Sequence, residues 1–594
     1  MYGSRLSQAR AIRAPLTATT ALRNSATKPR HLARLYSSPS TPSGPSGSPN
    51  VKTTAFVSIA LLASAYALYS YEQSSTSSGS SASTDTFKGG EKFTLNIRTS
   101  RGPQAYEFLR RSSEDVERIL TEHETGEKSV GRSGNPVIRW DTNWVGSNEP
   151  CEDRWASNLI PRKQSSSDQK TSWLSSWYGS WPSEHGGASP DAQQQQQQAA
   201  KKDLMLFSIM DGHAGDATSK LLEKTLHPTL AVALAGLQAG YVPEKDGWKR
   251  WTQVISPTHW AEFALGKGNI WTPENVTKTI QNAYLQLDEH ICQAPIRLLP
   301  TLIQNTANPS EYPTARQTLV ALAQPAAAGA CSITTLVDAE NEDLYVALAG
   351  DCRAVAGWQG VDGKWRCDTL TEDQMGENPR EVERMKSEHP ASERDTVIKG
   401  GRVQGGLQPT RAFGDAVYKW TSAEGAAIAD AFREEGDKPR PVRPWNYTPP
   451  YVTARPEVTY RKLRNERGER LRFIIMATDG LWDRLTSEEA TLLLASYLAH
   501  PKHADIAKTT LPTLYPLAEP TSERPYPAQD LPQPKGESWA FEGDNNAATH
   551  LIRNSLAGAD RKSRAELLSL SGKVSRWMRD DVTVTVVFFG DDQQ

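Results

Sequence analysis

The stretch Leu204–Gly215 has the sequence LMLFSIMDGHAG, in which an apolar run is followed directly by an aspartate. The fold predicted for the whole chain depends on this pattern. Its first seven residues, up to Met210, are almost all apolar and predict a buried strand. Asp211 follows directly, and a carboxylate at the end of a buried strand needs a partner, because an ionised carboxylate is costly to bury alone. The stretch therefore predicts a core strand with an acidic side chain at its end.

The same arrangement recurs along the chain. Asp351 ends the run VALAGD, Asp479 follows FIIMAT, and Asp580 with Asp581 directly precedes VTVTV. For any single one of these residues, a strand-end cap or a turn is the ordinary alternative. Several converging carboxylates, however, repel one another and need hard cations such as Mg²⁺ or Mn²⁺. The spacing alone leaves open whether these side chains converge.

Other apolar runs predict the rest of the core. Strands are expected over 332–337, 344–349, 473–477 and 582–589, and helices over 276–292 and from Thr486, where Thr-Ser-Glu-Glu forms a capping box. Strands and helices are interleaved without a regular βαβ rhythm, which favours an α+β layered fold over a doubly wound sheet.

One catalytic domain is expected over 93–590, interrupted by insertions. The stretch 164–200 is rich in Ser and ends in glutamines, whereas 437–450 and 512–535 are rich in Pro, so all three are predicted as loops. The first contains Trp173–Trp181 (WLSSWYGSW), which is a candidate docking surface or packs on the flank of its own domain.

The composition excludes several classes of protein. The chain has 594 residues, 37% of them hydrophobic, which is ample for a large core. Its five cysteines show no C-x-x-C spacing, so neither a structural zinc site nor a dense disulfide framework is expected. The net charge is −2, but residues 1–71 carry +8, which leaves −10 for residues 72–594. So acidic a body is a poor candidate for nucleic-acid binding, and no nucleic-acid partner is expected.

The N-terminal region is typical of a targeting sequence. Residues 1–50 are rich in Arg, Ser, Thr and Ala and lack acids, which predicts a mitochondrial transit peptide; a disordered basic tail is the alternative. Residues 53–71 carry no charge and as a helix would cover about 28 Å, enough to cross a bilayer. Since a polar linker over 72–92 follows, a transmembrane helix in the inner mitochondrial membrane is preferred to a buried core helix. The catalytic body would then face the intermembrane space or, if fully imported, the matrix.

Separated motifs carry a family resemblance. The chain resembles the metal-dependent type 2C protein phosphatases, and in particular the fungal mitochondrial members of their pyruvate dehydrogenase phosphatase branch. The motifs that carry the resemblance, in order, are CEDRW, FSIMDGHAGDA, LYVALAGDCRAVAG, ENPREVERMKSEHP, TRAFGDAVYKW, YVTARPEVTY, ATDGLWD and RDDVTVTVV. Eight motifs agree in identity and order over about residues 93–590, apart from the insertions.

The resemblance implies a fold and a set of metal ligands. The fold is a central antiparallel β-sandwich flanked by helices in four layers, with two ions, Mg²⁺ or Mn²⁺, in a cleft at one end. Asp211 resembles the carboxylate that bridges both ions, and the carbonyl of Gly212 is an expected ligand. The other ligands that the resemblance implies are Glu152, its weaker companion Asp153, Asp415 and Asp580, and a looser third site of Asp351 with Asp415.

The resemblance also implies a general acid and a phosphate contact. His213 resembles the histidine that protonates the leaving serine oxygen, and a histidine suits that role because its pKa lies near neutrality. A loop histidine that caps the following helix is the alternative. Many family members bind the substrate phosphate with an arginine four residues before the Glu-Asp pair. Here that position is Asn148, as in the pyruvate dehydrogenase phosphatase branch, so an amide is expected to contact the phosphate.

The expected function is that of a mitochondrial protein serine/threonine phosphatase that hydrolyses its substrate with a metal-activated water. The branch implies the pyruvate dehydrogenase complex as the partner, which dephosphorylation would reactivate. A body held outside the matrix could not reach that complex, so another mitochondrial phosphoprotein in the intermembrane space is the alternative. A catalytically silent, membrane-anchored scaffold is disfavoured, because it would be expected to lose a ligand residue and the expected ligands are all present. A nuclease is disfavoured by the acidic body.

Overall fold

The computed structural model describes residues 90–99, 102–128, 135–147, 149–160, 203–238, 271–304, 314–433, 443–499, 504–518 and 536–590. They all belong to one compact unit, Thr53–Gln594. The predicted leader (1–50), the predicted span (53–71), most of the predicted linker (72–92), Asn148 and the predicted insertion 164–200 lie outside the described residues. Within the described segments, no helix has the length and apolar character needed to cross a membrane.

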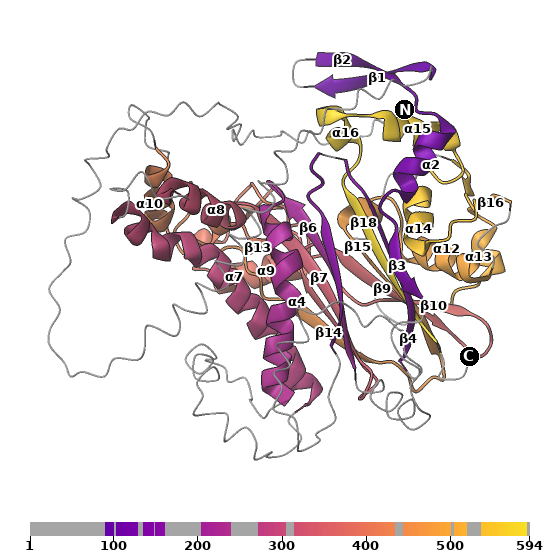
Figure 1. The fold of residues 1–594 in the computed structure, drawn as a ribbon, viewed down its shortest axis with the longest axis horizontal. Helices are drawn as coiled ribbons and strands as arrows, with labels where there is room; N and C mark the ends of the chain where they lie inside the picture. Colours follow the sequence, from indigo (N-terminus) through magenta and orange to yellow (C-terminus); the bar gives the residue numbers. More distant parts are fainter. Residues whose placement is uncertain are drawn as a thin grey trace, which may run out of the picture. The chain divides into compact units, whose positions relative to one another are not determined.

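Two six-stranded antiparallel sheets form the centre of this unit (Figure 1). The first sheet has the order β10 (Trp365–Thr369), β9 (Arg353–Gln359), β15 (Arg470–Ala477), β18 (Val582–Phe589), β4 (Val137–Val145) and β3 (Thr125–Lys128). The second has the order β14 (Glu457–Lys462), β8 (Asp343–Ala349), β7 (Gly329–Asp338), β6 (Leu204–His213) and β5 (Arg154–Ile160), with β13 (Phe413–Gly414) paired to β7. The strands predicted from apolar runs are confirmed.

The apolar run of β6 is continuous because both faces of this strand are buried. Phe207 and Ile209 pack between the sheets, against Ile474 and Val587 of the other sheet. The alternate residue Met210 packs on the opposite face, in the core that helices cover. A strand with one wet face would alternate in polarity, so the run LMLFSIM reflects a strand inside a four-layer stack.

Helices cover the outer face of each sheet, as Figure 1 shows. The helices α4 (Ala217–Gln238) and α7 (Pro273–Gln304) share a core with β6, β7 and β8, while α12 (Ser487–Ala499) and α14 (Ala547–Ser555) share one with β15 and β18. The predicted α+β fold, an antiparallel sandwich flanked by helices, is therefore confirmed. The capping box predicted at Thr486 is confirmed too, because its N–H donates to Glu489 Oε2 at 2.9 Å and its Oγ1 accepts from the Glu489 N–H at 3.1 Å.

Shorter elements complete the described unit. The helices are α2 (Ser113–Thr121), α8 (Ala315–Ala327), α9 (Pro379–Glu388), α10 (Ser422–Ala431), α11 (Asp479–Trp482), α13 (Leu511–Leu514), α15 (Arg561–Ser569) and α16 (Gly572–Met578), with 3₁₀ turns at Ala391–Glu393 and Ala416–Tyr418. The two-stranded pairs are β1 (Lys92–Thr99) with β2 (Gly102–Leu109), β11 (Ile398–Lys399) with β12 (Arg402–Val403), and β16 (Ile506–Ala507) with β17 (Ser538–Trp539).

The strand directions bring the predicted acidic positions to one end of the sandwich. In the second sheet, Asp211 at the end of β6 pairs with Cys331 of β7, whose neighbour Ser332 pairs with Ala349 at the end of β8. In the first sheet, the end of β15 pairs with the beginning of β18, which pairs with the end of β4. Antiparallel pairing thus makes four separated strand ends meet.

A buried polar chain crosses the interface between the second sheet and its helices. Tyr284 Oη donates to Thr334 Oγ1 at 2.6 Å, Thr334 contacts Ser208 Oγ at 2.6 Å, and Ser208 Oγ lies 2.8 Å from His227 Nε2. His227 Nδ1 lies 2.6 Å from Asn158 Oδ1 and can donate to it. Burial lowers the pKa of His227 to about 3, so the folded protein holds this imidazole neutral.

This neutral histidine predicts a specific acid sensitivity. Above about pH 6.5 both the folded and the unfolded chain hold the imidazole neutral, and its contribution to stability is complete. As the pH falls from 6.5 toward 3, the unfolded chain gains a proton that the folded chain refuses, so stability is lost. His227→Gln removes this titration, and the wild type should lose about 1.4 kcal/mol per pH unit more than the variant. Urea unfolding at several pH values checks this, and parallel curves would contradict it.

Candidate active site

Three carboxylates from three separate strand ends meet at one end of the sandwich. Oxygen atoms of Asp211, Asp351 and Asp479 lie within 4.8 Å of one another. Asp211 lies two residues before the end of β6, and Asp351 follows β8 in a turn that begins at Gly350 (φ +127°). Asp479 is the first residue of α11 and lies two residues after the end of β15. Asp479 belonged to the predicted strand-end acids but not to the predicted ligand set. Its position after FIIMAT, the same pattern that singled out Asp211, was the signal that could have placed it there.

The electrostatics of this cluster fit a divalent cation. Burial raises the pKa of Asp211 well above its usual range, and the neighbouring carboxylates of Asp153, Asp479 and Asp351 add to the shift. Burial and the charge of Asp351 raise the pKa of Asp479 in the same way. Because each carboxylate opposes the ionisation of the others, the ionised cluster is stable only with a positive charge among them.

A second group of acids supports the first. Burial, followed by the charge of Asp581, raises the pKa of Asp153 to about 7, and Asp153 Oδ2 accepts from Thr583 Oγ1 at 2.8 Å. Asp581 itself ties down the loop that carries Glu152 and Asp153. Its Oδ1 accepts from the N–H of Ser147 at 2.5 Å and its Oδ2 from the N–H of Glu152 at 2.8 Å. In the sequence, Asp581 stands out only as the neighbour of Asp580, whereas in the structure it anchors this loop.

Glu152 and Asp580 each have a partner outside the three clustered carboxylates. Glu152 Oε1 accepts from the N–H of Gly215 at 2.7 Å, and burial raises the pKa of Glu152. Asp580 forms an ion pair with Arg576, and the charge of Arg576 also lowers the pKa of Asp211. Glu152 is therefore held against the turn after His213, and the charge of Arg576 acts on both Glu152 and Asp211.

His213 is hydrogen-bonded to Asp415, which is not one of the three clustered carboxylates. His213 Nε2 lies 2.6 Å from Asp415 Oδ2. The glycine at 329 makes this contact possible, because a Cβ there would lie 2.1 Å from His213 Nε2 and 2.2 Å from Asp415 Oδ2. Burial opposes protonation of the ring, but the charge and hydrogen bond of Asp415 outweigh it and raise the pKa of His213. Asp415, for which the resemblance implied metal ligation, is thus the partner of the imidazole.

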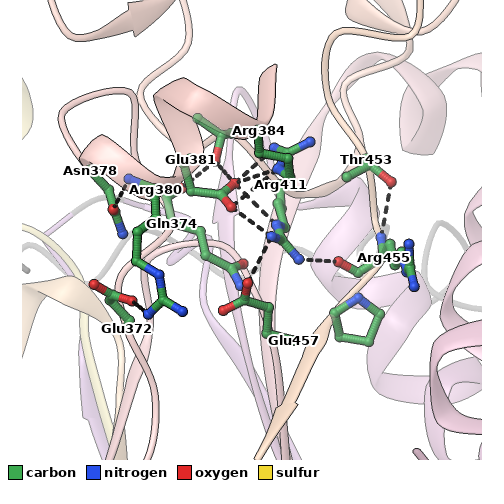
Figure 2. A network of polar contacts seen from close by, with 12 residues as sticks. Glu372, Gln374, Asn378, Arg380, Glu381, Arg384, Arg411, Thr453, Arg455 and Glu457 are labelled. Atoms are coloured by element: carbon green, nitrogen blue, oxygen red, sulfur yellow. Dashed lines mark hydrogen bonds and ion pairs between the residues drawn. The ribbon is translucent and has the colours of Figure 1, made fainter. Parts of the chain in front are cut away.

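An ion-pair network holds the start of the segment that carries Asp415 (Figure 2). Arg411 Nη2 contacts Glu381 Oε1 at 2.6 Å and Glu457 Oε1 at 3.1 Å. Thr410 Oγ1 donates to the other oxygen of Glu381 at 2.5 Å and to the carbonyl of Gln374 at 3.1 Å. Gln374 Oε1 in turn accepts from the N–H of Gly350 at 2.8 Å. The network connects the segment before Asp415 with the turn that carries Asp351.

The fold and the site define a class of enzyme: a hydrolase that uses clustered carboxylates and divalent cations. The family model for protein phosphatase 2C matches residues 278–512. The chain is 31% identical over 473 residues to a protein phosphatase 2C homolog of Schizosaccharomyces pombe, covering 78% of this chain and 83% of the relative. It is 32% identical to the mitochondrial pyruvate dehydrogenase phosphatase 1 of Saccharomyces cerevisiae (79% and 72% covered) and 30% identical to the human phosphatase 2 (82% and 84% covered).

The chain therefore belongs to the protein phosphatase 2C family. It is a protein serine/threonine phosphatase of the metal-dependent type.

Asp479→Asn tests the cation site without an activity assay. Without metal, the variant should melt at a higher temperature than the wild type, because one of three repelling carboxylates becomes neutral. With Mn²⁺ the order should reverse, since the wild type gains binding energy, about 2.7 kcal/mol at a hundredfold excess over Kd, and the variant gains much less. Thermal melts with EDTA and with Mn²⁺ check this.

Asp415→Asn is the matched control, because its carboxylate faces His213. It should keep the Mn²⁺-dependent rise in melting temperature. A rise lost in Asp415→Asn and kept in Asp479→Asn would show that Asp415 is a ligand and that the assignment of Asp479 is wrong.

Proposed function

We propose that this enzyme hydrolyses phosphoserine and phosphothreonine in a mitochondrial phosphoprotein, with the phosphorylated component of the pyruvate dehydrogenase complex as its substrate. The observation that carries the chemistry is the cluster of Asp211, Asp351 and Asp479 beside the His213–Asp415 pair. An acidic cluster supplies cation binding, and the adjacent histidine supplies a proton. These are the two requirements of phosphate-ester hydrolysis at neutral pH.

The ligand set is drawn from the acids at the end of the sandwich. Asp211 would be the ligand shared by two Mg²⁺ or Mn²⁺ ions. The other residues that hold the ions are the carbonyl of Gly212 and the carboxylates of Asp479, Asp351, Glu152, Asp153 and Asp580. When bound, the ions activate a water molecule for attack on phosphorus and neutralise the phosphate oxygens. The repulsion among the carboxylates supports this set, because the site needs positive charge to ionise fully.

His213 donates the proton that the leaving group needs. As the P–O bond to the serine breaks, the serine oxygen becomes an alkoxide that must be protonated. Because Nε2 faces Asp415, Nδ1 is the nitrogen that can hand over a proton. The raised pKa of His213 favours the protonated form of the imidazole, which is the form that a general acid requires. Asp415 orients the ring in the same way that a carboxylate orients the histidine of other acid–base pairs.

The substrate and the location come from the relatives and the N-terminal region. Two relatives at 32% and 30% identity are named as mitochondrial phosphatases of pyruvate dehydrogenase. The leader over residues 1–50 has the composition of a mitochondrial transit peptide. A helix over 53–71 would attach the enzyme to the inner membrane, and reaching a matrix complex requires the catalytic domain on the matrix side. A phosphoprotein of the intermembrane space is the second candidate substrate, favoured if that helix stops transfer.

Asp211→Asn tests the chemistry. Because this residue is the shared ligand, the variant should lose at least about a hundredfold in turnover of a phosphoserine peptide with Mn²⁺, while its fold stays intact. Phosphate release and circular dichroism measure the two properties. Wild-type turnover in the folded variant would show that the metal assignment is wrong.

The substrate has a test of its own. In cells that lack this protein, quantitative phosphoproteomics should show more phosphoserine on the dehydrogenase component of the complex. An unchanged dehydrogenase with another mitochondrial phosphosite rising would assign the enzyme to that second protein and leave the chemistry in place. Protease protection of a C-terminally tagged chain, with and without rupture of the outer membrane, distinguishes the two compartments.

A further inference from the structure

We infer that the buried ion pair between Asp288 and Lys419 is a positioning device that holds Asp415 in contact with His213. The inference rests on the proposed function, because it assigns a purpose to the geometry of the proposed general acid. Neither residue touches the carboxylate cluster or the imidazole. Asp288 lies on α7, and Lys419 follows the 3₁₀ turn Ala416–Tyr418.

The contacts of the pair converge on the segment that carries Asp415. Lys419 Nζ lies 2.7 Å from both oxygens of Asp288 and donates to the carbonyl of Ala412 at 2.8 Å. Asp288 Oδ1 also accepts from the N–H of Gly414 at 2.9 Å. The pair therefore forms hydrogen bonds to the segment on both sides of Phe413, at the residues one and three positions before Asp415. We call these contacts of the ion pair the clamp.

The segment needs such a clamp because its backbone is strained. Gly414 and Asp415 both have positive φ, +68° and +48°. For Asp415, a residue with a Cβ, the left-handed conformation costs of order 1 kcal/mol and persists only where the surroundings enforce it. The N–H of Asp415 donates to the carbonyl of Ala328 at 2.8 Å, which fixes the turn against the start of β7. A released segment would relax toward negative φ and swing the carboxylate away from Nε2.

Burial makes the clamp rigid. The side chains of Lys419 and Asp288 are 8% and 9% exposed, and the thiol of Cys292, one turn further along α7, contacts Asp288 Oδ1 at 3.5 Å. A charge pair in such a place contributes little net stability, because both charges lose their hydration. Its contribution is directional, since hydrogen bonds of a buried charge are short and costly to break. The chain thus keeps an ion pair where an apolar pair would give equal stability, which is understandable if the pair positions a functional residue.

The clamp predicts a defect that depends on the leaving group. Displacing a catalytic group by about 1 Å costs on the order of a hundredfold. Lys419→Met should therefore lower kcat for a phosphoserine peptide by about ten- to a hundredfold, because the serine alkoxide needs the proton of His213. Hydrolysis of p-nitrophenyl phosphate should stay within about twofold of the wild type, because p-nitrophenolate leaves without a proton.

The measurement compares four variants with both substrates at saturating Mn²⁺. His213→Gln is the reference for a lost general acid and should show the same selective defect, in larger measure. Arg366→Met is the matched control: Arg366 forms a similarly buried ion pair with Glu469 on the edge of the first sheet, so it should reduce the melting temperature without any selective defect. The double variant Asp288→Leu, Lys419→Met removes both charges and should recover melting temperature. Its selective defect should persist, because Gly414 has lost its acceptor.

The outcomes separate the inference from the proposed function. The inference is wrong, and the pair is only a stabilising contact, if Lys419→Met shows no selective defect, as expected for Arg366→Met. The same conclusion follows if Lys419→Met loses turnover equally with both substrates, or if the double variant regains wild-type turnover. If His213→Gln itself loses both substrates equally, the general acid of the proposed function is wrong. A selective defect in His213→Gln, Lys419→Met and the double variant, with none in Arg366→Met, supports both.

Discussion

Repulsion among buried carboxylates is the constraint on which the rest of this structure depends. Asp211, Asp351 and Asp479 come within 4.8 Å of one another, and their burial and mutual charge raise the pKa of Asp211 and of Asp479. Left alone, such a cluster would push strand ends apart or take up protons. A cation changes the sign of the interaction, so carboxylates that repel one another without a cation are suited to bind one. The same repulsion among the carboxylates therefore lowers the stability of this end of the sandwich and favours cation binding there.

The packing of the sandwich holds the carboxylates in place against this repulsion. Both faces of β6 are covered, by the other sheet and by α4 and α7, so the strand that carries Asp211 has no free direction in which to move. Further from the cluster, Asp581 fixes the loop of Glu152 through two backbone N–H groups, and the Arg411–Glu381 network fixes the segment before Asp415. These supports come from regions far apart in sequence. A rigid frame around a repelling centre is how a protein prepares a site before its ligand arrives.

The sequence predicted most of the fold and part of the site, for physical reasons that differ. The strands of the core were predictable because burial on both faces leaves unbroken apolar runs, as in Leu204–Met210, and the acids at their ends were visible for the same reason. The contact of Asp415 with His213 was not predictable, because it depends on Gly329, which lies on another strand. The contacts of Asp581 and of the Asp288–Lys419 pair join residues that are far apart in sequence. Asp581 and Ser147 are separated by 434 positions, and Asp288 and Lys419 by 131, so no local sequence pattern predicts these contacts.

Asp211 and His213 of β6 have different surroundings, because different residues of β7 lie opposite them. Asp211 and His213 are two positions apart, so a regular strand places both side chains on one face. Asp211 pairs across the ladder with Cys331, and His213 pairs with Gly329. Without a side chain at 329, Asp415 can reach Nε2 and engage the imidazole at 2.6 Å. Asp211, by contrast, lies with the carboxylates of Asp351 and Asp479. Gly329 on the neighbouring strand thus makes room for the contact between Asp415 and His213, two positions from Asp211 on the same strand.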